Sequence, residues 1–179
     1  VTPDYFVKHH GGKIPSGVLR TVIPAAPDAW ITALEKFGTM SFGEVAAAAT
    51  RFARDGFPMH GFMADYIRDH EQDYRTWPSS AAVFLPGGKP PAVGDLFVQS
   101  DLGRTLQYMA DEEAAHRKHG RAAGLQAARD AFYRGDIAAA IVEYHKENGG
   151  LVTARDMADF HVRFEAPVRT RFADIELIA

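Results

Sequence analysis

The sequence contains no cysteine among its 179 residues. Disulfide bonds and thiolate catalysis are therefore excluded, while the absence itself fits any cellular compartment. No stretch approaches the roughly 20 apolar residues that a transmembrane helix needs, and the first ten residues lack the apolar core of a signal peptide. We therefore expect a soluble chain without a membrane partner, in the cytoplasm or in a periplasmic or secreted location.

An excess of charge of one sign is also missing. The formal net charge is −3, from 20 lysines and arginines against 23 aspartates and glutamates. Because nucleic-acid binding usually needs a basic excess, we expect no nucleic-acid partner. Hydrophobic residues make up 46% of the chain and charged residues 24%, which is typical of a folded globular protein. At this length one domain with a sizeable core is expected.

Helical signals fill the first part of the chain. Apolar residues recur on one face between Ala26 and Phe37, and Gly38 provides a stop. Ser41 and Glu44 have the spacing of a capping box, in which each side chain binds the backbone of the other residue. The alanine-rich helix that follows, residues 43–55, is expected to be buried because small side chains let helices approach closely.

Two longer helical regions are predicted next. Residues 59–77 form one predicted helix that Pro78 breaks, and residues 83–85 are predicted as a short extended segment. Ser100 is a good N-cap for a helical region over 101–132, with an interruption near residues 120–124.

A helix, a stop and a second helix then follow in close order. The first helix runs from about Gly135 to Glu147, and Thr153 caps the second. Asn148 or Gly149 is expected to adopt a positive φ and close the first helix. Its neighbour Gly150 is then expected to tolerate substitution by alanine better than the residue with the positive φ.

The last residues alternate between apolar and polar side chains, which predicts a pair of strands over 164–179 with a turn at Ala173-Asp174. A few strand residues are also expected over 1–6. The predicted fold class is mainly α with a C-terminal β-strand pair.

Two patterns could bind a metal ion. His9-His10-Gly11-Gly12-Lys13 places two histidines side by side, but neighbours on a regular element point in different directions, so a solvated turn is the better interpretation. Glu113 and His116 have the Glu-x-x-His spacing of di-iron bundles. Such sites need a second copy and two further glutamates, so an exposed charged helix face is the better interpretation.

Two other patterns could support catalysis or phosphate binding. Asp69-His70-Glu71 with Asp73 could form an acid–base dyad, although surface charge explains it as well. Pro86-Gly87-Gly88-Lys89 is not a phosphate loop, because Pro90-Pro91 prevents the helix that should follow. The sequence has no Gly-x-Ser-x-Gly, no His-Glu-x-x-His and no Rossmann glycine pattern. We therefore predict no catalytic residue, no metal ligand and no cofactor in this chain.

Four collinear stretches resemble one known family. They are LEKFGTMSFGEV at 34–45, ARDGFP at 53–58, QSDLGRTL at 99–106, and AFYRGDIA with GGLVTARD at 131–138 and 149–156. Taken together, these stretches make the chain similar to γ-glutamyltranspeptidases. The resemblance spans nearly the whole chain.

The resemblance implies a fold and an activity. The segment, residues 1–179, would be the central to C-terminal part of the large subunit of an N-terminal-nucleophile hydrolase, an αββα sandwich. Residues from about 24 to 160 would form its helical part, and the strands between about residues 162 and 179 would belong to the central sheets of the full enzyme. A precursor would cleave itself and release a threonine at the N-terminus of the small subunit. That threonine would attack a γ-glutamyl amide, with its own α-amine as base and a backbone oxyanion hole.

The same resemblance places the functional residues outside this chain. The nucleophile would follow Ala179, and the arginine that binds the substrate carboxylate, in an Arg-Glu-x-Ala-Pro motif, would precede Val1. We therefore expect this chain alone to be inactive. Its partners would be the remainder of its own precursor, including the small subunit, and a γ-glutamyl small molecule.

Two departures from the family leave the substrate open. Pro24-Ala25-Ala26, followed by Asp28, stands where the family usually has Pro-Gly-x, and residues 111–128 are longer than the matching segment of glutathione-processing members. A related amide acylase or hydrolase of the same fold is an alternative. A helical interaction module without catalytic activity is another.

Overall fold

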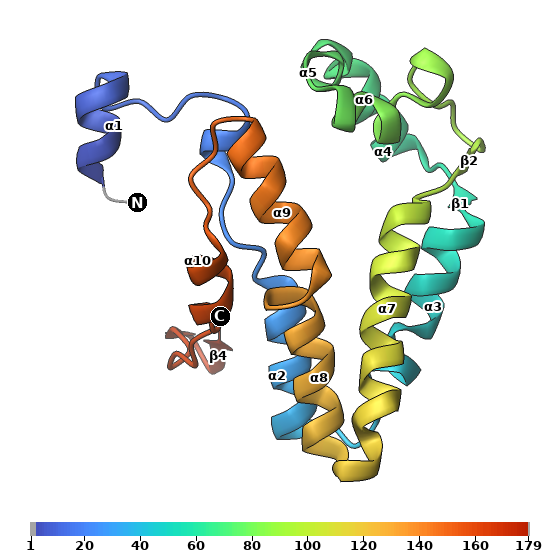
Figure 1. Cartoon of the computed structure of the whole chain (residues 1–179), viewed down its shortest axis with the longest axis vertical. Coiled ribbons are helices and arrows are strands. Elements are labelled where there is room, and N and C mark those ends of the chain that lie inside the picture. The colour runs from blue at the N-terminus through green and yellow to red at the C-terminus, as the bar shows by residue number, and fades with distance from the viewer. Residues whose placement is uncertain (1–2, 179) are drawn as a thin grey trace.

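The computed structural model describes residues 3–178. The chain folds mainly into helices, which form two arms that diverge from one turn (Figure 1). The helices are α1 (Pro3–His10), α2 (Ala26–Phe37), α3 (Phe42–Asp55), α4 (Gly61–Asp69), α5 (Glu71–Thr76), α6 (Pro78–Phe84), α7 (Ser100–His116), α8 (Arg121–Tyr133), α9 (Asp136–Glu147) and α10 (Ala154–Asp159), with 3-10 turns η1 (Val18–Arg20), η2 (Pro86–Gly88) and η3 (Arg117–His119). No helix within residues 3–178 is long and apolar enough to cross a membrane.

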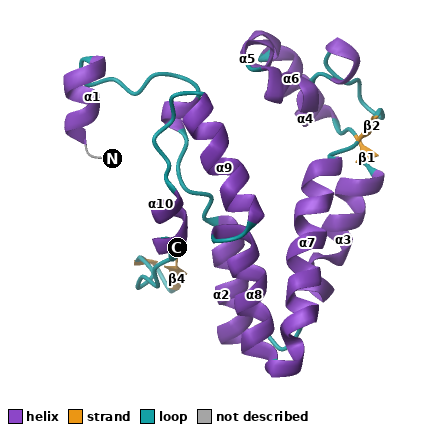
Figure 2. Cartoon of the chain, in the orientation of Figure 1, coloured by secondary structure: helices purple, strands orange, loops and turns teal. Residues whose placement is uncertain are grey.

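Helices α3 and α7 pack along each other in one arm, and α2, α8 and α9 form the other (Figures 1 and 2). The antiparallel pair of short strands β1 (Phe57–Pro58) and β2 (Leu96–Phe97) joins the first arm to the small helices α4, α5 and α6. One hydrophobic cluster is formed mainly by side chains of α2, α3, α7 and α8. A second, smaller cluster is formed by side chains in or next to α4, α6 and β2.

The two arms also touch at their open ends. The hydroxyl of Ser79 in α6 lies 3.3 Å from the hydroxyl of Tyr144 in α9. The indole ring of Trp77 covers Gly17 so closely that a Cβ atom there would lie 2.3 Å from the ring. Because Gly17 also has a positive φ of 94°, glycine is the residue that fits this crossing.

The helix signals of α2 and α3 are confirmed. Helix α2 has the predicted bounds, and the capping box of Ser41 and Glu44 is present in both directions. The prediction that the alanine-rich helix is buried holds for one stripe only. Its buried residues recur every three or four positions, and they are Phe42, Ala46, Thr50 and Ala53. The remaining alanines, Ala47, Ala48 and Ala49, are exposed.

The single helix predicted over 59–77 is wrong. The chain forms α4 and α5, with a kink at His70, where φ is −111° and ψ is 22°. Pro78 begins helix α6, since its fixed φ suits the first helical position. The extended segment predicted over 83–85 is also wrong, because Val83 and Phe84 are the last residues of α6.

Two other local predictions are corrected. Gln99 is the N-cap of α7, so Ser100 is the first helical residue and makes no capping bond. The strand expected near residues 1–6 is a helix, α1, in the described part of that segment, while Val1 and Thr2 lie outside the described residues. Acidic Asp4 in its first turn and basic residues in its last turn interact favourably with the helix dipole.

The predicted interruption after α7 is confirmed by η3 and by Gly120, whose φ is 104°.

In the segment from α9 to α10 the predicted helix end and the second helix are confirmed, but the expected tolerance of Gly150 for alanine is wrong, because a Cβ atom there would lie 2.1 Å from His145 Nδ1. Gly149 adopts a φ of 71°, and the N–H of Gly150 donates to the carbonyl of His145 at 2.6 Å, which closes the end of α9. Thr153 and Asp156 then form a capping box at the start of α10.

The predicted C-terminal strand pair is confirmed. Strands β3 (Arg169–Phe172) and β4 (Ile175–Ile178) pair antiparallel around a turn at Ala173-Asp174, and Ala173 has a φ of 55°. Ala179 lies outside the described residues. All eight strand residues are exposed, so neither face of this hairpin is covered within residues 3–178.

Candidate functional site

A buried ion pair joins α2 to α8. Asp28 is 1% exposed and Arg129 is 3% exposed, and the Arg129 Nε donates to Asp28 Oδ1 at 2.5 Å. Burying two charges is costly unless their remaining hydrogen-bonding groups are also satisfied. The second oxygen of Asp28 accepts from the backbone N–H of Val162 at 2.7 Å, and Arg129 Nη2 donates to the carbonyl of Phe160. Arg129 Nη1 has no hydrogen-bond partner within residues 3–178.

Tyr133 supports this pair one turn further along α8. Its hydroxyl accepts from the backbone N–H of Asp28 at 3.2 Å and donates to the carbonyl of Pro24 at 2.5 Å. Its ring stacks on Phe160 with centroids 5.7 Å apart. Burial, together with the nearby Asp28 carboxylate, raises the pKa of the Tyr133 hydroxyl above its ordinary value. The phenol therefore stays protonated and acts as a fixed donor.

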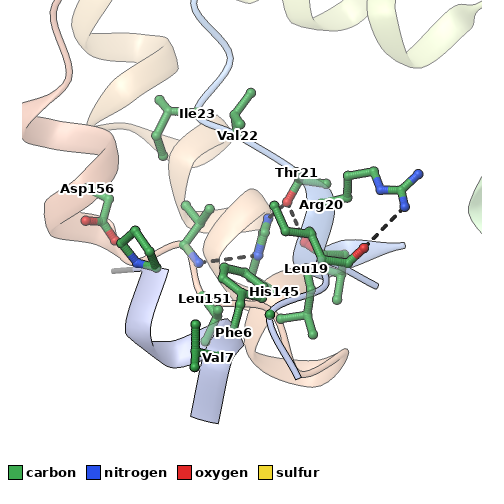
Figure 3. Close-up of a pocket in the computed structure, with 15 residues that line it drawn as sticks. Phe6, Val7, Leu19, Arg20, Thr21, Val22, Ile23, His145, Leu151 and Asp156 are labelled. Carbon is green, nitrogen blue, oxygen red and sulfur yellow. Dashed lines mark hydrogen bonds between the residues drawn. The ribbon is translucent and has the colours of Figure 1, made fainter. Parts of the chain in front are cut away.

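A second feature is a mainly apolar cavity of about 600 Å³ at the end of the second arm (Figure 3). Side chains from α1, η1, the segment after η1, α9 and the segment before α10 line it, including Phe6, Val18, Val22, His145 and Leu151. His145 is its main buried polar group, at 6% exposed.

His145 and Thr21 resemble a base and a nucleophile, but their hydrogen bonds exclude these roles. The imidazole Nδ1 accepts from the N–H of Val152 at 3.4 Å, which places the proton on Nε2. Nε2, 3.2 Å from Thr21 Oγ1, then acts as a donor (Figure 3). The hydroxyl of Thr21 donates to the carbonyl of Val18 at 2.7 Å. His145 cannot remove that proton, so the pair links α9 to the segment around η1.

The burial of His145 should make the stability of the fold depend on pH. Burial lowers the pKa of His145 below its usual value of about 6.5. The unfolded chain therefore binds more protons than the folded chain below about pH 6.5, and stability should fall as the pH drops through that value. The slope from this group approaches at most about 1.4 kcal/mol per pH unit. Urea unfolding at pH 7.5 and pH 5.5 should show a smaller loss in His145→Gln than in the wild type.

The pH window separates His145 from the carboxylates. Hydrogen bonds from the Ser41 backbone and hydroxyl lower the pKa of Glu44, and the Thr153 hydroxyl and backbone lower that of Asp156. Stability from these groups is lost only below their ordinary pKa values of about 4. Equal losses in wild type and His145→Gln would contradict the prediction.

The structure corrects the interpretation of the Glu113–His116 pair. Glu113 is buried, and its two oxygens accept from the backbone N–H groups of Phe42 at 2.9 Å and Gly43 at 2.8 Å. It caps the N-terminus of α3 from α7, where a negative charge is favourable. His116 faces solvent and contacts the Glu112 carbonyl instead. The exposed charged face predicted for both residues is therefore wrong for Glu113.

The other candidate motifs do not come together in one site. His9 and His10 lie in the last turn of α1, so the predicted solvated turn is wrong for the histidines, but it is confirmed at Gly11-Gly12, which follow the helix with φ values of 59° and 79°. Asp69 and Asp73 are exposed, His70 stacks on Tyr66, and Glu71 pairs with Arg75. Pro86-Gly87-Gly88 forms η2, and Lys89 follows it in an extended conformation. Within residues 3–178, no three His, Asp or Glu side chains are close enough to hold a metal ion.

The ion pair and the His145 link were not predicted, although the sequence contains one signal for the former. Arg129 lies four residues after Leu125 and four before Tyr133, and both of these are buried in α8. A helical position between two buried ones at i±4 lies on the same buried face. A charge there needs a buried partner, but its partner Asp28 lies 101 positions away.

A model of the family described as gamma-glutamyltranspeptidase matches residues 1–179. The chain belongs to the γ-glutamyltranspeptidase family. The acylase ACY 1 proenzyme of Pseudomonas sp. (strain SE83) is 32% identical over 162 residues, which cover 90% of this chain and 26% of that protein. The glutathione hydrolase proenzyme of Bacillus subtilis (strain 168) is 28% identical over 173 residues, covering 93% of this chain and 27% of that protein.

The fold is shared as well. The crystal structure of Helicobacter pylori γ-glutamyltranspeptidase superposes with a TM-score of 0.76 at 23% identity, covering 95% of this chain and 46% of that chain. The chain spans about a quarter of the length of the two curated relatives described above. The resemblance predicted from the four sequence stretches is confirmed.

Proposed function

We propose that this chain is a scaffold segment in the large subunit of an N-terminal-nucleophile amide transferase or hydrolase that acts on γ-glutamyl compounds. A threonine released by self-cleavage, in another part of the precursor, is the proposed nucleophile. The match of the family model to residues 1–179 carries the proposal. The names of two relatives, each called a proenzyme, support a precursor that is processed.

The C-terminal hairpin supports a role within a larger sheet structure. In the register of β3 and β4, Thr170 pairs with Leu177 and Phe172 with Ile175. Paired residues share a face, so one face of the hairpin is mainly apolar. An exposed apolar face with open edges needs another sheet layer or further strands. We propose that the central sheets of an αββα sandwich provide both.

The relatives favour two donor classes, because one is named an acylase and another a glutathione hydrolase. A matched pair of anilides separates these. The γ-glutamyl anilide carries an α-ammonium group, and glutaryl anilide is the same amide without it. A site that hydrogen-bonds that ammonium rejects the analogue by a factor on the order of 10⁴ in kcat/KM.

The test uses the full-length precursor. We expect self-cleavage into two chains, seen by mass spectrometry, followed by turnover that favours the γ-glutamyl anilide. A preference for the glutaryl anilide would assign the protein to the acylases. A precursor that stays intact and cleaves neither anilide would favour a helical interaction module.

The isolated 179-residue chain should release no chromophore from γ-glutamyl anilide. Within residues 3–178 the best nucleophile–base geometry, Thr21 with His145, has its hydrogen bonds directed the wrong way for proton removal. The same assay on the full-length protein at equal molarity is the positive control. Activity of the short chain that persists through repeated purification would contradict the proposed position of the nucleophile.

A further inference from the structure

We infer that the buried Asp28–Arg129 pair takes the place of a neighbouring β-strand and sets the register of the segment that leads into the C-terminal hairpin. It is a positioning pair for self-cleavage, acting through the placement of β3 and β4. This role in self-cleavage rests on the proposed function, whereas the effect on the hairpin does not.

The hydrogen bonds of the pair follow the pattern of a parallel strand. In an extended chain, the C=O of one residue and the N–H of the residue two positions later point to the same side. A residue on a parallel neighbour donates to that C=O and accepts from that N–H. Here Arg129 donates to the Phe160 carbonyl and Asp28 accepts from the Val162 N–H at 2.7 Å. Phe160 itself is extended, with φ −69° and ψ 132°.

Both members of the pair are held by helices and cannot shift freely. Arg129 lies in the middle of α8 and is buried, and the backbone of Asp28 is fixed by the hydroxyl of Tyr133. The ring of Phe160 also stacks on Tyr133. Further on, Phe164 contacts the end of α2, where Lys36 Nζ lies 3.6 Å from its ring centroid. The helices therefore contact the chain at Phe160, Val162 and Phe164, before β3 begins at Arg169.

Register matters for the hairpin because its two faces differ. The face of Phe172, Ile175 and Leu177 is apolar, while Arg171 and Glu176 pair on the other face. A slip of one residue turns each side chain to the opposite face of a sheet. A slip before β3 would therefore present the charged face to the sheet layer that the apolar face should meet.

The experiment compares variants of the full-length precursor. Arg129→Met removes both donors but keeps the length of the side chain. Its matched control is Glu113→Gln, which weakens another buried carboxylate contact, one whose hydrogen bonds go to α3 and not to residues 160–178. The readouts are hydrogen exchange of the backbone amides and the rate of self-cleavage.

In Arg129→Met we expect exchange at Val162 and in β3 and β4 to rise about tenfold or more, since charge-assisted hydrogen bonds are lost. Self-cleavage should slow by a similar factor. In Glu113→Gln, exchange should rise in α3 and not in residues 160–178. Equal increases over 160–178 in both variants, or none in Arg129→Met, would overturn the inference.

Asp28→Asn provides a second variant if Arg129→Met fails to fold. Asparagine has nearly the same shape but one acceptor oxygen, which should face the charged Arg129 donor and leave the amide NH2 opposite the Val162 N–H. Faster exchange at the Val162 amide is therefore expected, and unchanged exchange there would overturn the inference. Because exchange is measured in the uncleaved precursor too, a protein that never cleaves itself would refute the proposed function without deciding this point.

Discussion

Asp28→Ala should lower the free energy of unfolding by about 3–5 kcal/mol, the largest effect we expect from one substitution. The change leaves Arg129 as an unpaired charge in a site where it is 3% exposed. It also leaves the Val162 N–H without the carboxylate that now accepts from it. Urea unfolding of the wild type and the variant at pH 7 measures the difference directly.

Two further variants show whether charge burial is the cause. Asp130→Ala removes a neighbouring carboxylate that is more than a third exposed and should cost little, as exposed ion pairs usually do. The double variant Asp28→Leu with Arg129→Met removes both charges and should be more stable than Asp28→Ala alone. If Asp28→Ala costs no more than Asp130→Ala, the pair does not have the buried character described above.

Gly150→Val should destabilise the protein more than Gly149→Ala. A Cβ atom at Gly150 would lie 2.1 Å from His145 Nδ1 and 2.7 Å from Val18 Cγ2, so the imidazole must move and lose its link to Val152. Overpacking of this kind costs about 1–3 kcal/mol, and the lost hydrogen bonds add to that cost. At Gly149 a side chain meets no atom within 4 Å but must adopt a φ of +71°, which costs about 1–2 kcal/mol.

Melting temperatures of Gly150→Ala, Gly150→Val and Gly149→Ala test this order. Both Gly150 variants should melt below Gly149→Ala, and the loss of the His145 link should also flatten the pH dependence between pH 7.5 and 5.5. The sequence predicted the opposite tolerance, because positive φ can be read from a helix stop while the position of the His145 side chain against Gly150 cannot. A Gly150→Ala protein as stable as the wild type would show that this junction can open without cost.

Local signals predicted much of the fold. The capping boxes of Ser41 and Thr153 and the stop at Gly149 each depend on residues within five positions of each other, so the sequence displays them directly. The kink at His70 was missed because no glycine or proline marks it. Pro78 was interpreted as a break although the same residue can begin a helix.

The buried polar groups could not be predicted in this way. Glu113 meets Phe42 across 71 positions, and Arg129 meets Asp28 across 101. Only the packing of α7 on α3 and of α8 on α2 brings these residues together. The family could be identified from the sequence because its motifs mark local turns and helix ends. The candidate site could not, because its two central contacts, Asp28–Arg129 and Thr21–His145, join residues 101 and 124 positions apart.

The crossing of Trp77 over Gly17 gives the molecule an optical reporter. The sequence has two tryptophans, and the other, Trp30, is 50% exposed on α2. With Trp30 replaced by phenylalanine, the fluorescence of the protein would come from Trp77 alone. Its emission would then follow the contact between the small helices of one arm and the segment before η1. Separation of the arms at this crossing would expose the Trp77 indole to water and would be visible in solution as a red shift, without unfolding the protein.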